Sequence, residues 1–146
     1  MFKKITALLV ILCLTFGFTC AVFADGIEYE PNNTMATASE IVSDGEEDCY
    51  TYGVVSSSDT SDWFQVSRTD MNRLMTIRLF MDSAINCDLY FYDSTGHLLG
   101  SSTNTTLGMY EKIEFVFTKD EVYYIKVTYV SGTVRAPYYL VVGLSL

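Results

Sequence analysis

From residue 49 to the end of the chain, apolar and polar residues alternate in short runs. A period of two residues places neighbouring side chains on opposite faces of a strand. The runs predict strands at 49–55, 62–68, 73–81, 87–93, 97–101, 109–118, 122–130 and 137–146. Turn-forming residues separate them, as in Asp93-Ser94-Thr95-Gly96. About eight strands with hardly any helix predict an all-β fold, an antiparallel β-sandwich of jelly-roll type, with a closed barrel as the alternative.

The strand expected at 62–68 carries Trp63, the only tryptophan of the chain. We expect its ring to be buried between the sheets as a core anchor. Phe64 would then lie on the opposite face and be more exposed. Asp59 and Asp62 precede the tryptophan, three residues apart, which suggests a cation site beside this strand.

Residues 1–24 have the pattern of a secretory signal peptide. Lys3 and Lys4 precede a long apolar run, and Val22 and Ala24 are small enough for the −3 and −1 positions of a cleavage site. A retained membrane anchor is the alternative, for which the run is short. Cleavage would leave 146 − 24 = 122 residues, enough for one domain with a core. We expect a secreted, extracellular protein without a membrane attachment after cleavage.

The remaining chain is strongly acidic. The whole sequence has 9 basic and 18 acidic residues, and removing the two lysines of the leader gives (9 − 2) − 18 = −11. This charge repels nucleic acid, which we exclude as a partner, and it attracts cations.

The segment 25–48 reads as an acidic linker with a short helical turn near 34–41, ahead of the sandwich at 49–146, so that 25–146 forms a single domain. Glu28 and Glu30 lie on one side of an extended chain, and the amides of Asn32 and Asn33 follow. Calcium binds six to eight oxygens from such groups, and a solvated acidic terminus is the alternative.

Two cysteines remain after the leader, Cys49 and Cys87. In an exported chain they predict one disulfide, and two unpaired buried thiols are the alternative.

The chain has 11 tyrosines, among them the adjacent pairs Tyr123/Tyr124 and Tyr138/Tyr139. One member of each pair must face away from the core, so these residues can form a strip that binds a target. Ordinary sandwich composition is the alternative. The single histidine, His97, follows a tight turn, and we expect no catalytic residues.

Several short motifs occur in a fixed order along the chain. They are Glu30-Pro31-Asn32-Asn33-Thr34, Ala36-Thr37-Ala38, Asp59-Thr60-Ser61-Asp62-Trp63-Phe64, Asp88-Leu89-Tyr90-Phe91-Tyr92-Asp93-Ser94-Thr95-Gly96, Tyr123-Tyr124-Ile125-Lys126-Val127 and Tyr138-Tyr139-Leu140-Val141-Val142. Together they resemble the bacterial pre-peptidase C-terminal domain family, and clostridial collagenase collagen-binding domains are similar. The resemblance covers essentially all of the chain after the leader.

The resemblance implies a jelly-roll sandwich that is usually attached to a secreted hydrolase and is not itself catalytic. In collagen-binding members a linker and a loop share calcium. Their Glu-x-Glu-x-Asn-Asp pattern falls on Glu28, Glu30, Asn32 and Asn33, with Asn33 departing from the final Asp, and their paired loop aspartates fall on Asp59 and Asp62. A further departure is that we find no enzyme segment beside this domain.

These observations predict a secreted, non-catalytic, calcium-binding module. It would bind an extracellular protein or polysaccharide, or accompany an exported peptidase. A secreted inhibitor or chaperone-like partner of a peptidase is the first alternative, and a small secreted hydrolase is the second.

Overall fold

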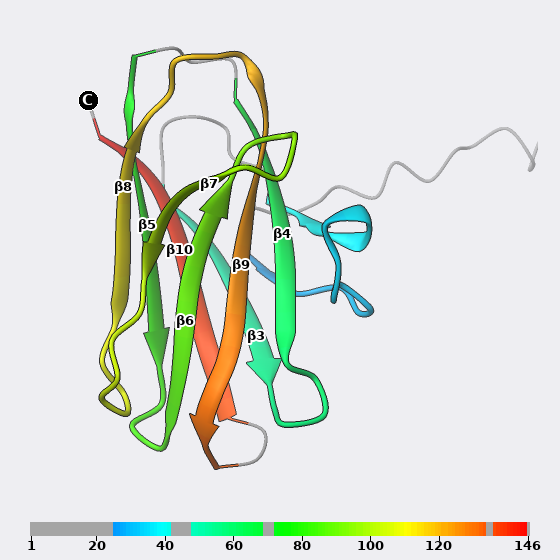
Figure 1. Cartoon of the computed structure of the whole chain (residues 1–146), viewed down its shortest axis with the longest axis vertical. Helices are drawn as coiled ribbons and strands as arrows, with labels where there is room; N and C mark the ends of the chain where they lie inside the picture. The colour runs from blue at the N-terminus through cyan, green and yellow to red at the C-terminus, as the bar shows by residue number, and fades with distance from the viewer. Residues whose placement is uncertain (1–24, 42–47, 69–71, 134–135, 146) are drawn as a thin grey trace, which may run out of the picture.

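The computed structural model describes residues 25–41, 48–68, 72–133 and 136–145, and the predicted leader at 1–24 lies outside them. Two five-stranded sheets pack face to face (Figure 1). The strands are β1 (Asp25–Ile27), β2 (Ser39–Glu40), β3 (Cys49–Val55), β4 (Ser61–Arg68), β5 (Leu74–Met81), β6 (Ile85–Tyr92), β7 (Leu98–Ser102), β8 (Glu111–Val116), β9 (Glu121–Gly132) and β10 (Ala136–Ser145). Sheet A has the order β1-β3-β10-β5-β8, and sheet B has the order β2-β4-β9-β6-β7. The predicted all-β sandwich is confirmed.

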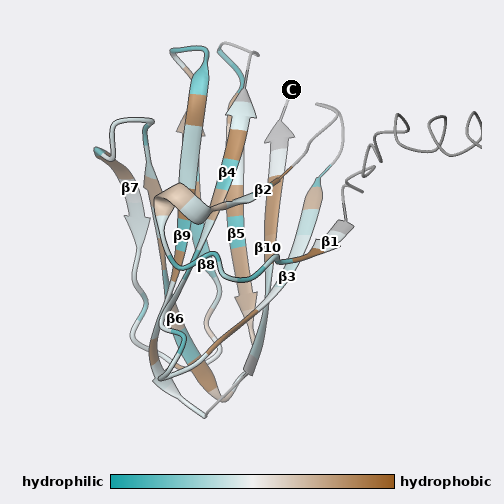
Figure 2. Cartoon of the chain, turned by 90° about the vertical axis from the view of Figure 1, so that its right-hand side faces the viewer, coloured by the Kyte–Doolittle hydropathy of each residue, from teal (hydrophilic) through white to brown (hydrophobic). Residues whose placement is uncertain are grey.

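The amino-terminal segment belongs to both sheets. β1 pairs in parallel with β3 at the edge of sheet A, and β2 pairs in parallel with β4 at the edge of sheet B. Figure 2 shows the chain between them running across the open side of the sandwich. The helical turn predicted there is present as η2 (Met35–Thr37). The remaining strand pairs are antiparallel.

Alternate side chains of the central strands fill the space between the sheets. On β6, for example, Ile85, Cys87, Leu89 and Phe91 are all fully buried. The ring of Phe91 lies 5.5 Å from that of Tyr123 on the neighbouring strand β9. The contacts in this core join residues that are far apart in the sequence, and they hold the two sheets together. Within the described ranges, no helix is long and apolar enough to cross a membrane.

Side chains of β4 face the opposite way from the prediction. Phe64 is fully buried and meets the ring of Tyr138 edge-on at 6.5 Å. Trp63 lies on the outer face of sheet B, with its ring 5.2 Å from that of Tyr92 and the Nζ of Lys126 5.4 Å from its centre. The expectation that Trp63 fills the core was therefore wrong. The outer face covers the indole with another ring and a lysine stem instead.

The predicted disulfide between Cys49 and Cys87 is not formed. Both residues are buried, but they lie at different levels of the sandwich. Cys49 pairs with Val142, whereas the N–H of Cys87 contacts the Sδ of Met81, which pairs with Tyr138. These levels are 142 − 138 = 4 residues apart on β10. At about 3.3 Å per residue this is about 13 Å, beyond the reach of a disulfide.

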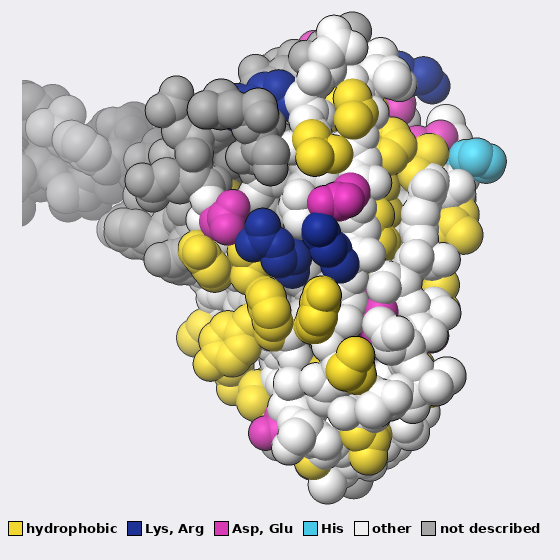
Figure 3. Space-filling model, turned by 90° about the vertical axis from the view of Figure 1, so that its left-hand side faces the viewer, with side chains coloured by type: hydrophobic (Ala, Val, Ile, Leu, Met, Phe, Trp, Pro, Cys, Tyr) yellow, Lys and Arg dark blue, Asp and Glu magenta, His cyan; other side chains and the backbone are white. Residues whose placement is uncertain are grey.

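Large apolar side chains also remain on the outside of sheet A. Tyr50, Phe80 and Tyr139 are among the exposed hydrophobic residues. Figure 3 shows hydrophobic side chains gathered beside basic and acidic side chains on one face of the molecule.

Candidate metal centre

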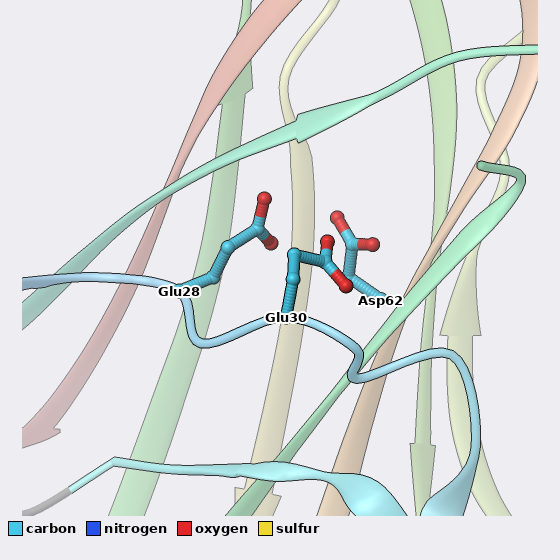
Figure 4. Close-up of side chains that lie close together, drawn as sticks. All are labelled: Glu28, Glu30 and Asp62. Atoms are coloured by element: carbon cyan, nitrogen blue, oxygen red, sulfur yellow. The ribbon is translucent and has the colours of Figure 1, made fainter.

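Three carboxylates from two distant parts of the chain meet where the amino-terminal segment crosses the sandwich. Glu28 and Glu30 follow β1, and Asp62 lies on β4 (Figure 4). One carboxylate oxygen from each lies within 4.8 Å of the others. Asp62 is fully buried, and it points inward because it shares its strand face with Phe64.

Strand pairing positions Glu28. Its N–H donates to the carbonyl of Tyr52 at 3.0 Å, which extends the pairing of β1 with β3 by one residue. The N–H of Val54 then donates to Glu28 Oε1 at 2.7 Å. A Cβ on Gly53 would collide with the Tyr138 hydroxyl and lie 2.6 Å from Glu28 Oε2, so glycine leaves the room that these groups occupy.

The hydroxyl of Tyr138 lies between two of the carboxylates. It is 2.6 Å from Asp62 Oδ2 and 2.9 Å from Glu28 Oε2. One proton serves one acceptor at a time, so this hydroxyl cannot satisfy both carboxylates. Burial and the two neighbouring carboxylates raise the pKa of Tyr138 well above its ordinary value, so it stays a donor.

Asn32 completes the inner wall of the centre. Its N–H donates to Glu30 Oε2 at 3.0 Å, and its Nδ2 donates to Glu28 Oε2 at 3.4 Å. Its carbonyl accepts from the N–H of Trp63 at 2.8 Å, which ties the segment to β4. The side-chain oxygen Asn32 Oδ1 is buried without a hydrogen-bond partner, as is Asp62 Oδ1. Two orphaned buried oxygens among carboxylates fit a hard cation, which takes oxygen ligands.

The electrostatics of the cluster disfavour three ionised carboxylates. Burial, which is the largest cause, and the carboxylates of Glu28 and Asp59 together raise the pKa of Asp62 to about 9, against the lowering effect of the hydrogen bond from Tyr138. Burial also raises the pKa of Glu30, the backbone N–H of Asn32 lowers it, and the charges of Asp59 and Glu28 raise it. A bound cation would reverse this balance and favour the ionised forms.

The six predicted ligands have different places in this centre. Glu28, Glu30 and Asp62 form the cluster, and Asn32 contacts it through its N–H and its Nδ2, with its Oδ1 buried and without a hydrogen-bond partner. The Nδ2 of Asn33 donates to Asp59 Oδ1, outside the cluster. Asp59 also lines a surface pocket together with Glu28 and Glu30. Sequence reasoning did not include Tyr138 in the centre.

The four tyrosines predicted as a binding strip are divided between core and surface. Tyr123 and Tyr138 are buried, whereas Tyr139 is exposed and Tyr124 is partly exposed. One member of each pair thus faces outward, as predicted. However, Tyr124 lies on sheet B and Tyr139 on sheet A, so the two outward residues face opposite sides of the molecule. They cannot belong to one strip. His97 is exposed on the turn before β7.

Comparison with known proteins identifies the fold. No family model matches the sequence, and no curated protein sequence matches it. The pre-peptidase C-terminal domain of a Bacillus anthracis collagenase superposes with a TM-score of 0.58, at 14% identity, over 73% of this chain and 94% of that domain. In fold, the chain resembles a pre-peptidase C-terminal domain. This confirms the sequence resemblance at the level of the fold.

A second solved structure has a similar architecture. It is Aeromonas hydrophila PliG, a periplasmic inhibitor of g-type lysozyme, with a TM-score of 0.50 and 12% identity. The match covers 83% of this chain and 99% of PliG. At these identities the two likenesses describe the fold alone.

Proposed function

We propose that the chain is a secreted, non-catalytic binding module whose amino-terminal segment is fastened by a calcium ion. It binds an extracellular protein or polysaccharide, or accompanies an exported peptidase. The observation that carries the proposal is the meeting of Glu28, Glu30 and Asp62 within 4.8 Å, with buried orphaned oxygens beside them. The fold shared with the collagenase domain supports the same assignment.

Glu28, Glu30, Asp62 and the Oδ1 of Asn32 would hold the ion. All four supply oxygen, which suits calcium or magnesium and not a softer metal. Calcium tolerates irregular sites, whereas magnesium demands near-octahedral geometry and gives up water reluctantly. The ion would supply the positive charge that lets all three carboxyl groups ionise side by side. It would thereby hold the segment between β1 and β2 against β4.

Thermal unfolding with calcium, with magnesium and with a chelator tests the proposal. Binding to the folded state alone stabilises by about 2.7 kcal/mol at a hundredfold excess over Kd, so calcium should raise the Tm by roughly 10 °C. Magnesium should do much less. Calcium should also protect the segment at 28–33 from proteolysis.

Two matched variants make this experiment specific. Asp62→Asn removes a cluster carboxylate and should reduce the calcium effect to about half or less. Asp88→Asn removes a carboxylate on the outer face of sheet B, where Asp88 accepts a hydrogen bond from Tyr90, and should keep it. An unchanged Tm in calcium for the wild-type protein would contradict the proposal.

Inhibition of an exported hydrolase is the second candidate function. The superposition with PliG covers nearly all of PliG and most of this chain, and this shared fold favours the inhibitor as a candidate. A g-type lysozyme and secreted peptidases assayed with an excess of the protein test it. A dose-dependent loss of hydrolase activity would favour the inhibitor, and full activity at saturating protein would exclude it for the enzymes assayed.

A further inference from the structure

A row of apolar side chains crosses the outer face of sheet A. Ile27 pairs with Tyr52, Tyr52 pairs with Tyr139, and Tyr139 pairs with Phe80. Tyr110, directly before β8, continues the row, with its ring centre 6.1 Å from that of Phe80 and the planes 28° apart. We call these five residues the sheet A row. At about 4.8 Å between strands, it spans about 19 Å.

The row is accessible to a ligand. Ile27 is 76% exposed, Tyr139 53%, Tyr110 51% and Phe80 43%, and Tyr52 is partly exposed. In Figure 3 hydrophobic side chains gather below basic side chains on one face of the molecule. Isolated exposed apolar residues are normal on a protein surface, whereas the largest contiguous apolar patch of a monomer is often functional.

The charges beside the row compensate each other. Arg78 lies on the same strand face as Phe80 and pairs with Asp48 at 3.4 Å. Lys112 is the register neighbour of Arg78 and pairs with Glu114 at 2.6 Å. The row itself contains no charged group. A neutral stripe on a chain with a net charge of −9 suits an uncharged partner.

The area of the row is too small for a stable dimer. Aromatic side chains bury about 150–250 Å² each, so half-exposed rings and one isoleucine offer about 400–500 Å². A stable protein interface needs about 800 Å² per partner. The narrow, linear shape fits an extended ligand about as wide as one side chain.

We propose that the sheet A row binds a neutral polysaccharide of β-1,4-linked pyranose units. Such a chain is a flat ribbon with apolar C–H faces and hydroxyl edges. Its faces would pack against the exposed surfaces of Tyr139, Phe80 and Tyr110, with the ring of Tyr52 edge-on to that of Tyr139 at 69°. The tyrosine hydroxyls and Lys112 would meet the edges of the ribbon. The proposal rests on the proposed function only in treating the chain as a binding module, because the row contains no metal ligand.

Affinity electrophoresis of the full protein in gels containing hydroxyethyl cellulose or glucomannan, with retention on insoluble chitin, tests the proposal. Polygalacturonate, which is anionic, is the negative control. The wild-type protein should bind at least one of the neutral probes. Tyr139→Ala and Phe80→Ala should each weaken that binding about tenfold. The matched control is Tyr124→Ala, an outward tyrosine on sheet B, which should bind as the wild type does.

Three results would overturn the proposal. The first is the absence of binding to all three neutral probes, and the second is equal binding by wild type, Tyr139→Ala and Phe80→Ala. The third is a wild-type dimer in sedimentation that Phe80→Ala dissociates, since the row would then join two copies. Circular dichroism and melting curves verify that each variant is folded.

Calcium separates this proposal from the proposed function. Ile27 lies next to Glu28, so a chelator should loosen one end of the row and leave its three central rings in place. Probe binding that persists in chelator, in a protein whose Tm does not respond to calcium, would support the row and reject the metal centre. A calcium response without probe binding would do the reverse.

Discussion

Protonation of Asp62 should make the stability of the metal-free protein fall as pH rises. Its carboxyl group has an ordinary pKa of 3.8, which the folded environment raises to about 9. Between these values the folded state keeps a proton that the unfolded state loses. The stabilising contribution is therefore complete below the ordinary pKa and is lost as pH rises toward the folded pKa.

The expected size follows from one proton. A difference of one bound proton changes the unfolding equilibrium about tenfold per pH unit, so a rise from pH 5 to pH 7 costs roughly 3 kcal/mol. For a domain of this size that lowers the Tm by roughly 10 °C. Asp62→Asn keeps the shape of the side chain and carries no titratable group. It should lose this component of the pH dependence while other groups contribute as before.

Denaturant unfolding in chelator, at steps between pH 5 and pH 7, measures the difference. The wild-type free energy of unfolding should fall more steeply with pH than that of Asp62→Asn. Saturating calcium should flatten the wild-type curve, because the ion holds the carboxylate ionised. Asp88→Asn should keep the wild-type slope. Parallel curves for wild type and Asp62→Asn in chelator would rule out a protonated Asp62 in the metal-free folded state.

Three further predictions concern the core, a thiol and the glycine beside the cluster. Phe64→Ala should destabilise the fold by about 3–5 kcal/mol and Trp63→Ala by clearly less, measured by denaturant unfolding, and the reverse order would place the indole in the core. Burial raises the pKa of the Cys87 thiol to about 12, so a thiol reagent should modify Cys87 at pH 8 only after unfolding, as peptide mass mapping would show. Gly53→Ala should lower the Tm and weaken calcium binding, because its methyl group displaces the Tyr138 hydroxyl, and an unchanged Tm would contradict this.

The periodicity of the sequence was enough to predict the sandwich. Alternation between residues 49 and 145 has a period of two nearly everywhere, and the strands lie close to their expected ranges. β1 and β2 were not predicted as strands, since runs of three and two residues carry no pattern. Their pairing depends on β3 and β4, which the local sequence does not contain.

Alternation gives two faces but does not say which one is buried. For β4 the largest ring suggested that Trp63 faces inward, whereas the buried Asp62 and Phe64 share the inner face. Asp62 faces inward because it meets Glu28 in the carboxylate cluster, and Glu28 is 34 positions away in the sequence (62 − 28). The local pattern of β4 therefore cannot show which face is buried. The predicted disulfide failed for a related reason. It was inferred from an expected export of the chain, which carries no information on where Cys49 and Cys87 lie along their strands.

Candidate ligands were easier to find than their arrangement. Closely spaced Glu28, Glu30 and Asn32 were visible in the sequence, and the structure brings them to Asp62. The position of the Tyr138 hydroxyl between two carboxylates depends on the register of β10 against β3, and no local sequence pattern shows that register. The same register aligns the sheet A row.

Calorimetric titration of the metal-free protein with calcium is the decisive experiment for the metal centre. We expect one bound ion per chain at pH 7 and an affinity at least about tenfold weaker for Asp62→Asn, since a cluster carboxylate is lost. Asp88→Asn should bind as the wild type does. Absence of calcium binding by the wild-type protein, or unchanged affinity in Asp62→Asn, would contradict the account.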